Sequence, residues 1–456
     1  MKNRIGLSLF TLGLLSRFCG FAAEPASGSN VPAAVAVEIR TEPASAPNTV
    51  PSGTDLASLS KHAEAELRGN ILPFWLKNTR NRERGGFYGV IDEKMRPHPE
   101  APRGALLTSR ILWTFSAAYR VYHDPEYLEM ARWAYRDLTD NFQDRESGGI
   151  FWTITADGKP DDTRKQIYGQ VFGVYALAEY FRATGEQAAL DQAIAIYRLV
   201  EKNASDPKNG GYFDAFKRDW TRMGDHSNML GRAPKSQNSH IHILEAYSNL
   251  LRVWPDAELR KSQRALIDVM LDHIVDPRTH HLILFLKPDW TPVSDEISYG
   301  HDIELSWLLV EAAEVLGDPV VVAKVKPVAI AIAKATLAEG VDPDGGVLNE
   351  GDPHGYTNTG KDWWPQAEAV VGFLNAYQLS QDPRYFAASQ HSWDFIQAKF
   401  VDRINGDWIE ATDRGGKALR RPKVTLWKCP YHNGRSCFEI IERIHALTTD
   451  QSHGAP

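Results

Sequence analysis

The apolar and polar positions along the chain follow a pattern that repeats about every 60 to 70 residues. A glycine-rich or similar turn signal opens each repeat, and a short run of alternating residues follows, such as Ile150-Phe151-Trp152-Thr153. Alternation with a period of two, ending in turn residues such as Asp157-Gly158, predicts a small β-hairpin. Six turn signals are present: Gly85-Gly86, Gly148-Gly149, Gly210-Gly211, His280-His281, Gly345-Gly346 and Asn405-Gly406.

Two helices are predicted after each of the first five hairpins. In the first repeat they run from about Arg103 to Tyr122 and from about Asp124 to Phe142. A helix-start signal separates the two helices, because Asp favours the N-cap and Pro the first helical position. The signals are, in order, Asp124-Pro125, Gly185-Glu186, Pro255-Asp256, Asp318-Pro319 and Asp382-Pro383.

The two ends of the chain complete this pattern. One long helix, about Tyr431 to Thr448, follows the sixth hairpin, and its missing partner stands at the start, about Asp55 to Lys77. Twelve helices result, and a ring of repeats closes its own ends without capping repeats. We therefore predict an all-α fold, an (α/α)6 barrel with short β-hairpins at one end, as one domain over residues 55–456. The alternative is an open helical array, which would leave the terminal helices without partners.

The N-terminal segment resembles an export signal. Lys2 and Arg4 precede an apolar run from Ile5 to Leu15, and small residues follow up to Ala23. The run is too short to span a bilayer. We therefore expect a signal peptide over residues 1–23, a flexible tether rich in Pro, Ala and Ser over residues 24–54, and a periplasmic or extracellular protein. The alternative is a disordered cytoplasmic leader.

Composition and charge narrow the set of partners. The chain is 43% hydrophobic and 24% charged, as in ordinary soluble globular proteins, and its net charge of −7 gives no sign of nucleic-acid binding. Removal of the signal would leave two cysteines, Cys429 and Cys437. Their spacing permits a disulfide in an oxidising compartment, but two free thiols are the default expectation. The oligomeric state stays open.

The repeat also predicts where a site lies. Every first helix of a repeat starts just after its hairpin, so the ring brings these starts to one end of the barrel. Polar groups that converge in a concave end are typical of a binding site. The residues near these starts are Arg110, Tyr168, Asn238 with His242, His301 with Glu304, Trp364 with Glu368, and His432 with Arg435.

Two histidines at equivalent repeat positions, His301 and His432, are the candidate acid/base residues. A single histidine at a helix start is more often a cap or a satisfied surface group, but the coincidence of two favours catalysis. His301 shares a helix face with Glu304, since the two are three residues apart. His240 and His242 are two apart and point different ways, so we expect only His242 to enter the site.

The neighbouring aromatic and cationic residues have two interpretations each. Trp363, Trp364 and Trp427 are either core residues or platforms that stack against sugar faces. Arg110 is either an ordinary helix-surface arginine or a cation of the site.

Four segments resemble motifs of the cellobiose 2-epimerases, which belong to the N-acylglucosamine 2-epimerase superfamily. The resemblance covers almost everything from about Asp55 to the end, and its most specific part is the Pro-Tyr-His-Asn-Gly-Arg run. It implies an (α/α)6 barrel, no required cofactor or metal, and reducing-end β-linked disaccharides as substrates. The segments are Ser109-Arg110-Ile111-Leu112-Trp113, Asn238-Ser239-His240-Ile241-His242, Tyr299-Gly300-His301-Asp302-Ile303-Glu304 and Trp427-Lys428-Cys429-Pro430-Tyr431-His432-Asn433-Gly434-Arg435.

The resemblance also implies roles for single residues. His301 and His432 match the family's two general acid/base residues. Two features depart from the family: the export signal with its tether, and Ser436 and Phe438 beside the last motif. The candidate substrate-binding and supporting residues are Arg110, Asn238, His242, Glu304, Trp364 and Trp427, with Tyr168 added for its place at a helix start.

These residue types suit epimerisation at C2. In the open-chain sugar, C2 lies next to the C1 aldehyde, so loss of its proton gives a delocalised enediolate without a redox cofactor. The sequence shows no convincing dinucleotide fingerprint. Two bases on opposite faces exchange the proton, and histidine both accepts and donates near neutral pH. A cation such as Arg110 would stabilise the oxyanion.

Three other functions remain open on the sequence alone. A glycoside hydrolase of this fold would need a carboxylic acid and a carboxylate. A related aldose–ketose sugar isomerase would share the enediolate, and a non-catalytic sugar-binding protein would explain the tryptophans but not the paired histidines. The carboxyl groups available for hydrolysis are Glu245, Glu304, Asp362 and Glu368.

Overall fold

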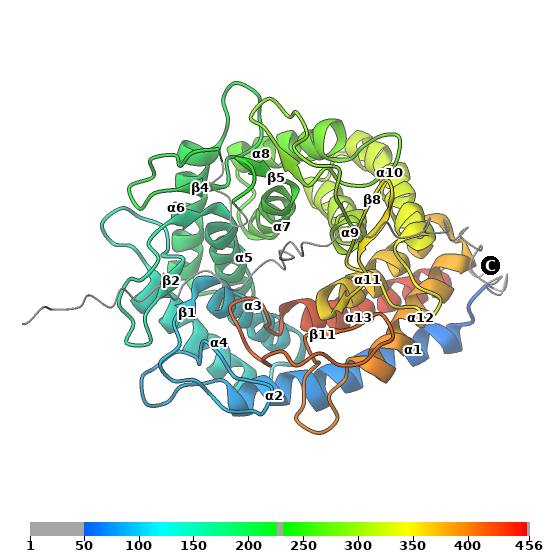
Figure 1. The fold of residues 1–456 in the computed structure, drawn as a ribbon, viewed down its shortest axis with the longest axis horizontal. Helices are drawn as coiled ribbons and strands as arrows, with labels where there is room; N and C mark the ends of the chain where they lie inside the picture. Colours follow the sequence, from blue (N-terminus) through cyan, green and yellow to red (C-terminus); the bar gives the residue numbers. More distant parts are fainter. Residues whose placement is uncertain (1–49, 226–230, 454–456) are drawn as a thin grey trace, which may run out of the picture. The chain divides into compact units, whose positions relative to one another are not determined.

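Six helices form a closed inner ring in the computed structural model, which describes residues 50–225 and 231–453 (Figure 1). Each inner helix contacts the next one along the chain, and the last contacts the first, so the ring closes. The inner helices are α3 (Ala105–Tyr122), α5 (Ile167–Thr184), α7 (Gln237–Val253), α9 (Tyr299–Leu316), α11 (Trp363–Ser380) and α13 (Tyr431–His453).

The outer helices alternate with the inner ones along the chain. The first is continuous from α1 through a π-helical turn, Leu67–Ile71, into α2 (Leu72–Asn78), and it packs against α13. The helices from the two chain ends are thus neighbours, and the predicted closed barrel is confirmed. The outer helices are α1 (Gly53–Glu66), α4 (Pro125–Asp137), α6 (Gln187–Ala204), α8 (Ala257–Val269), α10 (Pro319–Glu339) and α12 (Pro383–Lys399).

Burial explains the different patterns of the two sets. The inner helix α5 is buried on every side from Ile167 to Tyr180, because its neighbours in the ring and an outer helix surround it. The outer helix α6 buries one face, with Leu190, Ile196 and Val200 at helical spacing. The expected start signals are also present, for example in α10, where the Asp318 side chain accepts hydrogen bonds from two backbone N–H groups.

The short strands pair mostly between repeats, while the local hairpins that the sequence predicts are present chiefly as isolated bridges. In the described part of the chain, a strand before an inner helix pairs mostly with a segment of the next repeat, and only β8–β9 is a regular hairpin. Within repeats, single bridges remain, such as Ile154 with Pro160. Alternation marks an extended segment but does not specify its partner. The pairs are β1 (Arg103–Gly104) with β2 (Thr153–Ile154), β3 (Lys165–Gln166) with β4 (Ala215–Phe216), β5 (Lys235–Ser236) with β6 (Phe285–Leu286), β10 (Lys361–Asp362) with β11 (Ala411–Thr412), and β7 (Ile297–Ser298) with β8 (Glu350–Asp352), which pairs with β9 (Gly355–Asn358).

In four repeats, a backbone N–H of the turn segment donates a hydrogen bond to the side chain of the fourth residue of the inner helix that follows. His240 is one of these four acceptors, and both of its ring nitrogens are engaged. Nε2 accepts from the backbone N–H of Tyr212, and Nδ1 lies 2.7 Å from the Ser236 carbonyl oxygen. His240 is therefore a structural residue. The four bonds run from Ile150 N to Gln170 Oε1 (2.9 Å), from Tyr212 N to His240 Nε2 (3.0 Å), from Leu282 N to Asp302 Oδ1 (2.9 Å) and from Val347 N to Gln366 Oε1 (2.7 Å).

The described chain begins near the predicted start of the barrel. Helix α1 starts at Gly53 rather than Asp55, because Ser52 and Asp55 form a capping box that holds the first turn. The predicted signal and most of the tether, residues 1–49, lie outside the described residues. No described helix is long and apolar enough to cross a membrane. Cys429 and Cys437 are buried free thiols, as expected by default.

Candidate active site

Both candidate catalytic histidines lie beside one aromatic ring. The Trp364 ring on α11 lies 4.7 Å from the His301 ring on α9 and 5.7 Å from the His432 ring on α13, measured between centroids. A Cβ atom at Gly300 would come within 2.5 Å of the Trp364 side chain, which explains the glycine beside His301. The closed ring of inner helices thus brings together three residues that are far apart in the sequence.

Each of these histidines holds one ring nitrogen in a hydrogen bond. Nδ1 of His301 lies 2.7 Å from Oγ of Ser298, and Nδ1 of His432 lies 2.7 Å from Oε1 of Glu368. Within the described residues, Nε2 of each ring makes no hydrogen bond, so it is the nitrogen left for a substrate. Burial lowers the pKa of His301 to about 3 and the pKa of His432 well below its usual value. Both rings are therefore neutral in the free protein at neutral pH.

His242 adds a third imidazole to the same end of the barrel. Its Nδ1 lies 2.9 Å from Oε2 of Glu245, one helical turn further along α7. The rings of Tyr168 and Phe172 on α5 each lie 4.8 Å from the His242 ring. Burial lowers the pKa of His242, while the hydrogen bond to Glu245 opposes that shift. Of the two histidines on α7, this is the one that lies beside the other candidate site residues.

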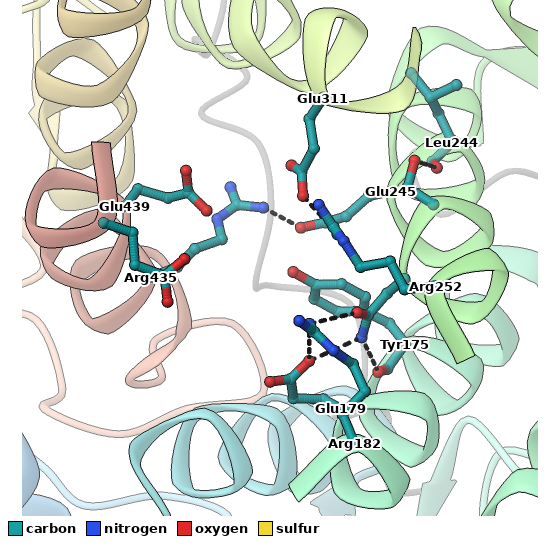
Figure 2. A network of polar contacts seen from close by, with 12 residues as sticks. Tyr175, Glu179, Arg182, Leu244, Glu245, Arg252, Glu311, Arg435 and Glu439 are labelled. Atoms are coloured by element: carbon teal, nitrogen blue, oxygen red, sulfur yellow. Dashed lines mark hydrogen bonds and ion pairs between the residues drawn. The ribbon is translucent and has the colours of Figure 1, made fainter. Parts of the chain in front are cut away.

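A buried arginine joins three carboxylates, two of which contact the site histidines His242 and His432. Arg435 of α13 is hydrogen-bonded to Glu245 and to the Tyr431 hydroxyl, and Figure 2 shows it reaching from α13 to α7. Its other terminal nitrogen lies 2.7 Å from Oε1 of Glu304 and 2.7 Å from Oε1 of Glu368. Four inner helices are therefore linked through one guanidinium.

One positive charge among three carboxylates forces their pKa values apart. Burial and the neighbouring Glu368 raise the pKa of Glu304 to about 8, and burial also raises the pKa of Glu368. Burial would raise the pKa of Glu245 as well, but the Arg435 guanidinium and the bond from His242 lower it to about 2. Glu304 therefore keeps a proton at neutral pH, and its buried Oε2 has no hydrogen-bond partner among the described residues.

Arg110 supplies a second buried cation beside the site. Its guanidinium donates to the Tyr168 hydroxyl at 2.8 Å and lies over the rings of Phe172 (4.4 Å) and Tyr431 (4.8 Å). The side chain is only 2% exposed, so the helix-surface interpretation of Arg110 is wrong. A cation held by aromatic faces, with no carboxylate bonded to it among the described residues, keeps most of its charge available for an anion.

The remaining predicted residues differ in their surroundings. Half-buried Trp427 lies 5.9 Å from the Tyr168 ring, measured between centroids. Asn238 is half-buried one turn before His242 on α7, and its Oδ1 has no partner among the described residues. Trp363 is a core residue, with 5% exposure, while its neighbour Trp364 is half-buried at the site.

The histidine and carboxylate cluster contains side chains of the kinds that bind metal ions. Ligand atoms of Glu304, Glu368 and His432 lie within 4.8 Å of one another, and this donor set suits a divalent cation. However, Arg435 already donates at 2.7 Å to an oxygen of each carboxylate. The cluster therefore fits a carboxylate–guanidinium network better than a metal centre.

A second polar network joins the C-terminal halves of the inner helices (Figure 2). Arg182 donates to Glu179 at 2.7 Å and to Asn249 at 3.0 Å, which links α5 to α7. Arg252 lies 2.8 Å from Glu311, which links α7 to α9. We call these five residues the far-end network. They lie away from the helix starts and stabilise the barrel at its opposite end.

Several site residues were not predicted as such from the sequence. Ser298 and Tyr431 were missed, and Glu245 was given a chemical role only in the hydrolase alternative. Ser298 has a local signal, since it stands three residues before His301 at the helix start. The bond between Glu368 and His432 has no local signal, because the two residues are 64 positions apart and meet only when the ring closes.

Comparisons with known proteins identify the family of this chain. The family model for N-acylglucosamine 2-epimerase matches residues 86–433. A cellobiose 2-epimerase of Bacteroides fragilis is 42% identical over 387 residues, which are 84% of this chain and 98% of that protein. The cellobiose 2-epimerase structure from Spirochaeta thermophila is 40% identical with a TM-score of 0.80, over 87% of this chain and 98% of that one. The structure from Bacillus thermoamylovorans is 38% identical with a TM-score of 0.81, over 85% and 100% of the two chains. The chain therefore belongs to the N-acylglucosamine 2-epimerase family, and it is a carbohydrate epimerase.

Proposed function

We propose that this protein inverts C2 of the reducing-end sugar of β-linked disaccharides, converting cellobiose to its glucosyl-mannose epimer and acting on mannobiose in the same way. The observation that carries the proposal is the pair of imidazoles, His301 and His432, which both lie beside Trp364. Each has Nδ1 engaged and Nε2 left for substrate, as two bases that work on opposite faces of one carbon would need. The similarity to cellobiose 2-epimerases supports the substrate class.

The proposed reaction moves one proton at a time. In the open-chain sugar, Nε2 of one histidine takes the C2 proton, and the electron pair of the C–H bond becomes part of an enediolate over C1 and C2. The other histidine, which has taken up a proton from solvent on Nε2, delivers it to the opposite face, the aldehyde re-forms, and the first histidine returns its proton to solvent. Proton transfer by a positioned group of this kind contributes about 10²- to 10⁴-fold to the rate.

Buried groups around the histidines would stabilise the charged intermediate. Arg110 carries a positive charge that no carboxylate binds among the described residues, so it would attract the enediolate oxygen. To deliver a proton from Nε2, His432 would first take one up there from solvent, forming an imidazolium whose charge the Glu368 carboxylate at Nδ1 balances. No redox cofactor takes part in this scheme.

Incubation of the purified protein with cellobiose in heavy water tests the proposal. We expect the epimer to carry deuterium at C2 and none at C3, as read by NMR, with the disaccharide bond intact. Mannobiose serves as the second substrate. A product that lacks deuterium at C2, or a failure to form any epimer from either sugar, would remove the proposal.

The same experiment separates the alternatives. A glycoside hydrolase would release monosaccharides, and the close carboxylates Glu304 and Glu368 would be its candidate pair. Both carboxyl groups are bound to the same Arg435 nitrogen. Neither is therefore free to act as the acid or the base on one side of a glycosidic bond. An aldose–ketose isomerase would deliver the proton to C1 and accumulate a 2-ketose.

Export of the protein is a separate part of the proposal. The charged start, the short apolar run and the small residues before Ala23 support a signal peptide. The substrate would then be met outside the cytoplasm.

A further inference from the structure

The hydroxyl group of Ser298 is used in an unusual way for its position. Ser298 is the N-cap residue of α9, where a serine side chain ordinarily accepts a hydrogen bond from a backbone N–H of the first turn. All residues of α9 are described, and none donates such a capping bond to Ser298. The hydroxyl instead lies 2.7 Å from Nδ1 of His301. The first turn of α9 therefore lacks this cap, and its histidine gains a partner.

The preceding repeat provides an internal comparison. Ser236 is the N-cap residue of α7, and its hydroxyl does accept from the backbone N–H of Ser239. It also donates to Asp214 at 2.6 Å. Position three after the cap is Ser239 in α7 and His301 in α9. The same serine thus caps its helix in one repeat and contacts the histidine in the next.

The surroundings of Ser298 fix the position of its hydroxyl. Ser298 belongs to β7, which pairs with β8 through Ser298 and Glu350, and the residue is only 6% exposed. The His301 ring also lies 4.7 Å from the Trp364 ring, measured between centroids. The hydroxyl at Nδ1 and the indole therefore both contact the imidazole, and Nε2 is the nitrogen that remains.

We propose that Ser298 is a positioning residue that keeps neutral His301 in the tautomer with its proton on Nδ1. In this tautomer Nδ1–H donates to the Ser298 oxygen, and the lone pair of Nε2 is free to take the C2 proton. The role in catalysis rests on the proposed epimerase function, whereas the tautomer itself does not. His432 differs, because its Nδ1 partner is the carboxylate of Glu368.

The tautomer can be measured without a sugar. Protein labelled with ¹⁵N at histidine reports the two ring nitrogens of each imidazole by NMR, and the spectrum of a His301→Asn variant assigns the His301 signals. We expect the wild type to show a protonated Nδ1 and an unprotonated Nε2 at His301. Ser298→Ala should shift this pair toward the other tautomer, while Ser298→Thr, which keeps the hydroxyl, should retain it. A wild-type His301 with its proton on Nε2 would overturn the proposal.

Kinetics supply the second test and the matched control. We expect Ser298→Ala to lower kcat about 10- to 100-fold with little change in KM, and Ser298→Thr to restore most of it, since partners that orient a reactive imidazole have effects of this size. Ser236→Ala removes the equivalent hydroxyl in the preceding repeat and should lower the melting temperature without changing kcat. If Ser298→Ala leaves both kcat and the ¹⁵N shifts unchanged, Ser298 does not position His301. If the shifts respond but the wild type never epimerises, the positioning stands and the proposed function falls.

Discussion

Oε1 of Glu368 lies 2.7 Å from Nδ1 of His432, and the same oxygen accepts a hydrogen bond from Arg435. The bond from Arg435 opposes the rise in pKa that burial causes in this carboxyl group, and its ionised form would stabilise His432 when it takes up a proton. Glu368→Gln keeps the shape but removes the charge. We expect kcat to fall about 10- to 100-fold, with KM less affected.

A matched control separates this effect from a general loss of stability. Glu179→Gln makes the same change in the far-end network, where the carboxylate binds Arg120 and Arg182. We expect it to lower the melting temperature and to leave kcat unchanged. Wild-type kcat in Glu368→Gln would contradict the proposed role of this carboxylate.

The raised pKa of Glu304 predicts that the stability of the protein depends on pH. In the native state it keeps its proton up to about pH 8, whereas an unfolded glutamate loses it near pH 4.5. The native state binds more protons between these values, so the free energy of unfolding falls as pH rises through this range. Glu304→Gln cannot lose a proton. We therefore expect the melting temperature of the variant, relative to the wild type, to increase from pH 5 to pH 8.

Glu245→Gln provides the opposite case for that experiment. The pKa of Glu245 is lowered to about 2, so its stabilising contribution is fully present above pH 4.5 and is lost only at lower pH. We expect a melting temperature below that of the wild type by the same amount at pH 5 and pH 8. A Glu304→Gln difference that is equally flat across this range would show that Glu304 is not protonated in the native state.

The sequence predicts those parts of the fold that depend on local patterns. Helices, caps and turns follow from residue spacing, and the six turn signals with a lone helix at each end were enough to predict the closed ring. The sequence also predicts that only one of His240 and His242 enters the site, since residues two apart on a helix point different ways. The structure shows what the first of these does, because His240 binds the backbone of Tyr212.

Local sequence patterns do not predict contacts between distant segments. The strand at Thr153–Ile154 bridges Pro160 in its own hairpin but also pairs with Arg103–Gly104, and alternation along the chain carries no information on this second partner. The cluster around Arg435 is also non-local, since its carboxylates come from three other helices. Its chemistry depends on burial and on charge balance, which no single segment of sequence reveals.

Trp364 and Trp427 are expected to hold the sugar rings. Replacing either with Ala should raise KM or lower kcat, by about tenfold if stacking contributes roughly 1.5 kcal/mol. The fold should remain, because both side chains are half-buried. Trp363→Ala is the control at the adjacent position, where a core side chain is lost and about 3–5 kcal/mol of stability with it. If Trp364→Ala melts as poorly as Trp363→Ala, its main role is packing.

The segment before the barrel is expected to be dispensable for activity. A chain that begins at Ser52 keeps the capping box of α1 and should match the full chain in kcat and melting temperature. A chain that begins at Leu56 loses this cap and should be less stable by about 1 kcal/mol. In the native host, N-terminal sequencing should find a start near Ala22 or Ala23, and an intact Met1 in the cytosol would contradict export.

The two histidines make the most direct prediction about the mechanism. Either His301→Asn or His432→Asn should lower net epimerisation by at least about a hundredfold, because proton return from the opposite face needs both bases. One base alone still removes the C2 proton and returns a proton from solvent to the same face. In heavy water, such a variant would label the unreacted substrate at C2 while making little epimer. This exchange without inversion distinguishes a lost base from a disrupted site, in which neither label nor epimer forms. Full epimerase activity in either variant would exclude that histidine from the mechanism.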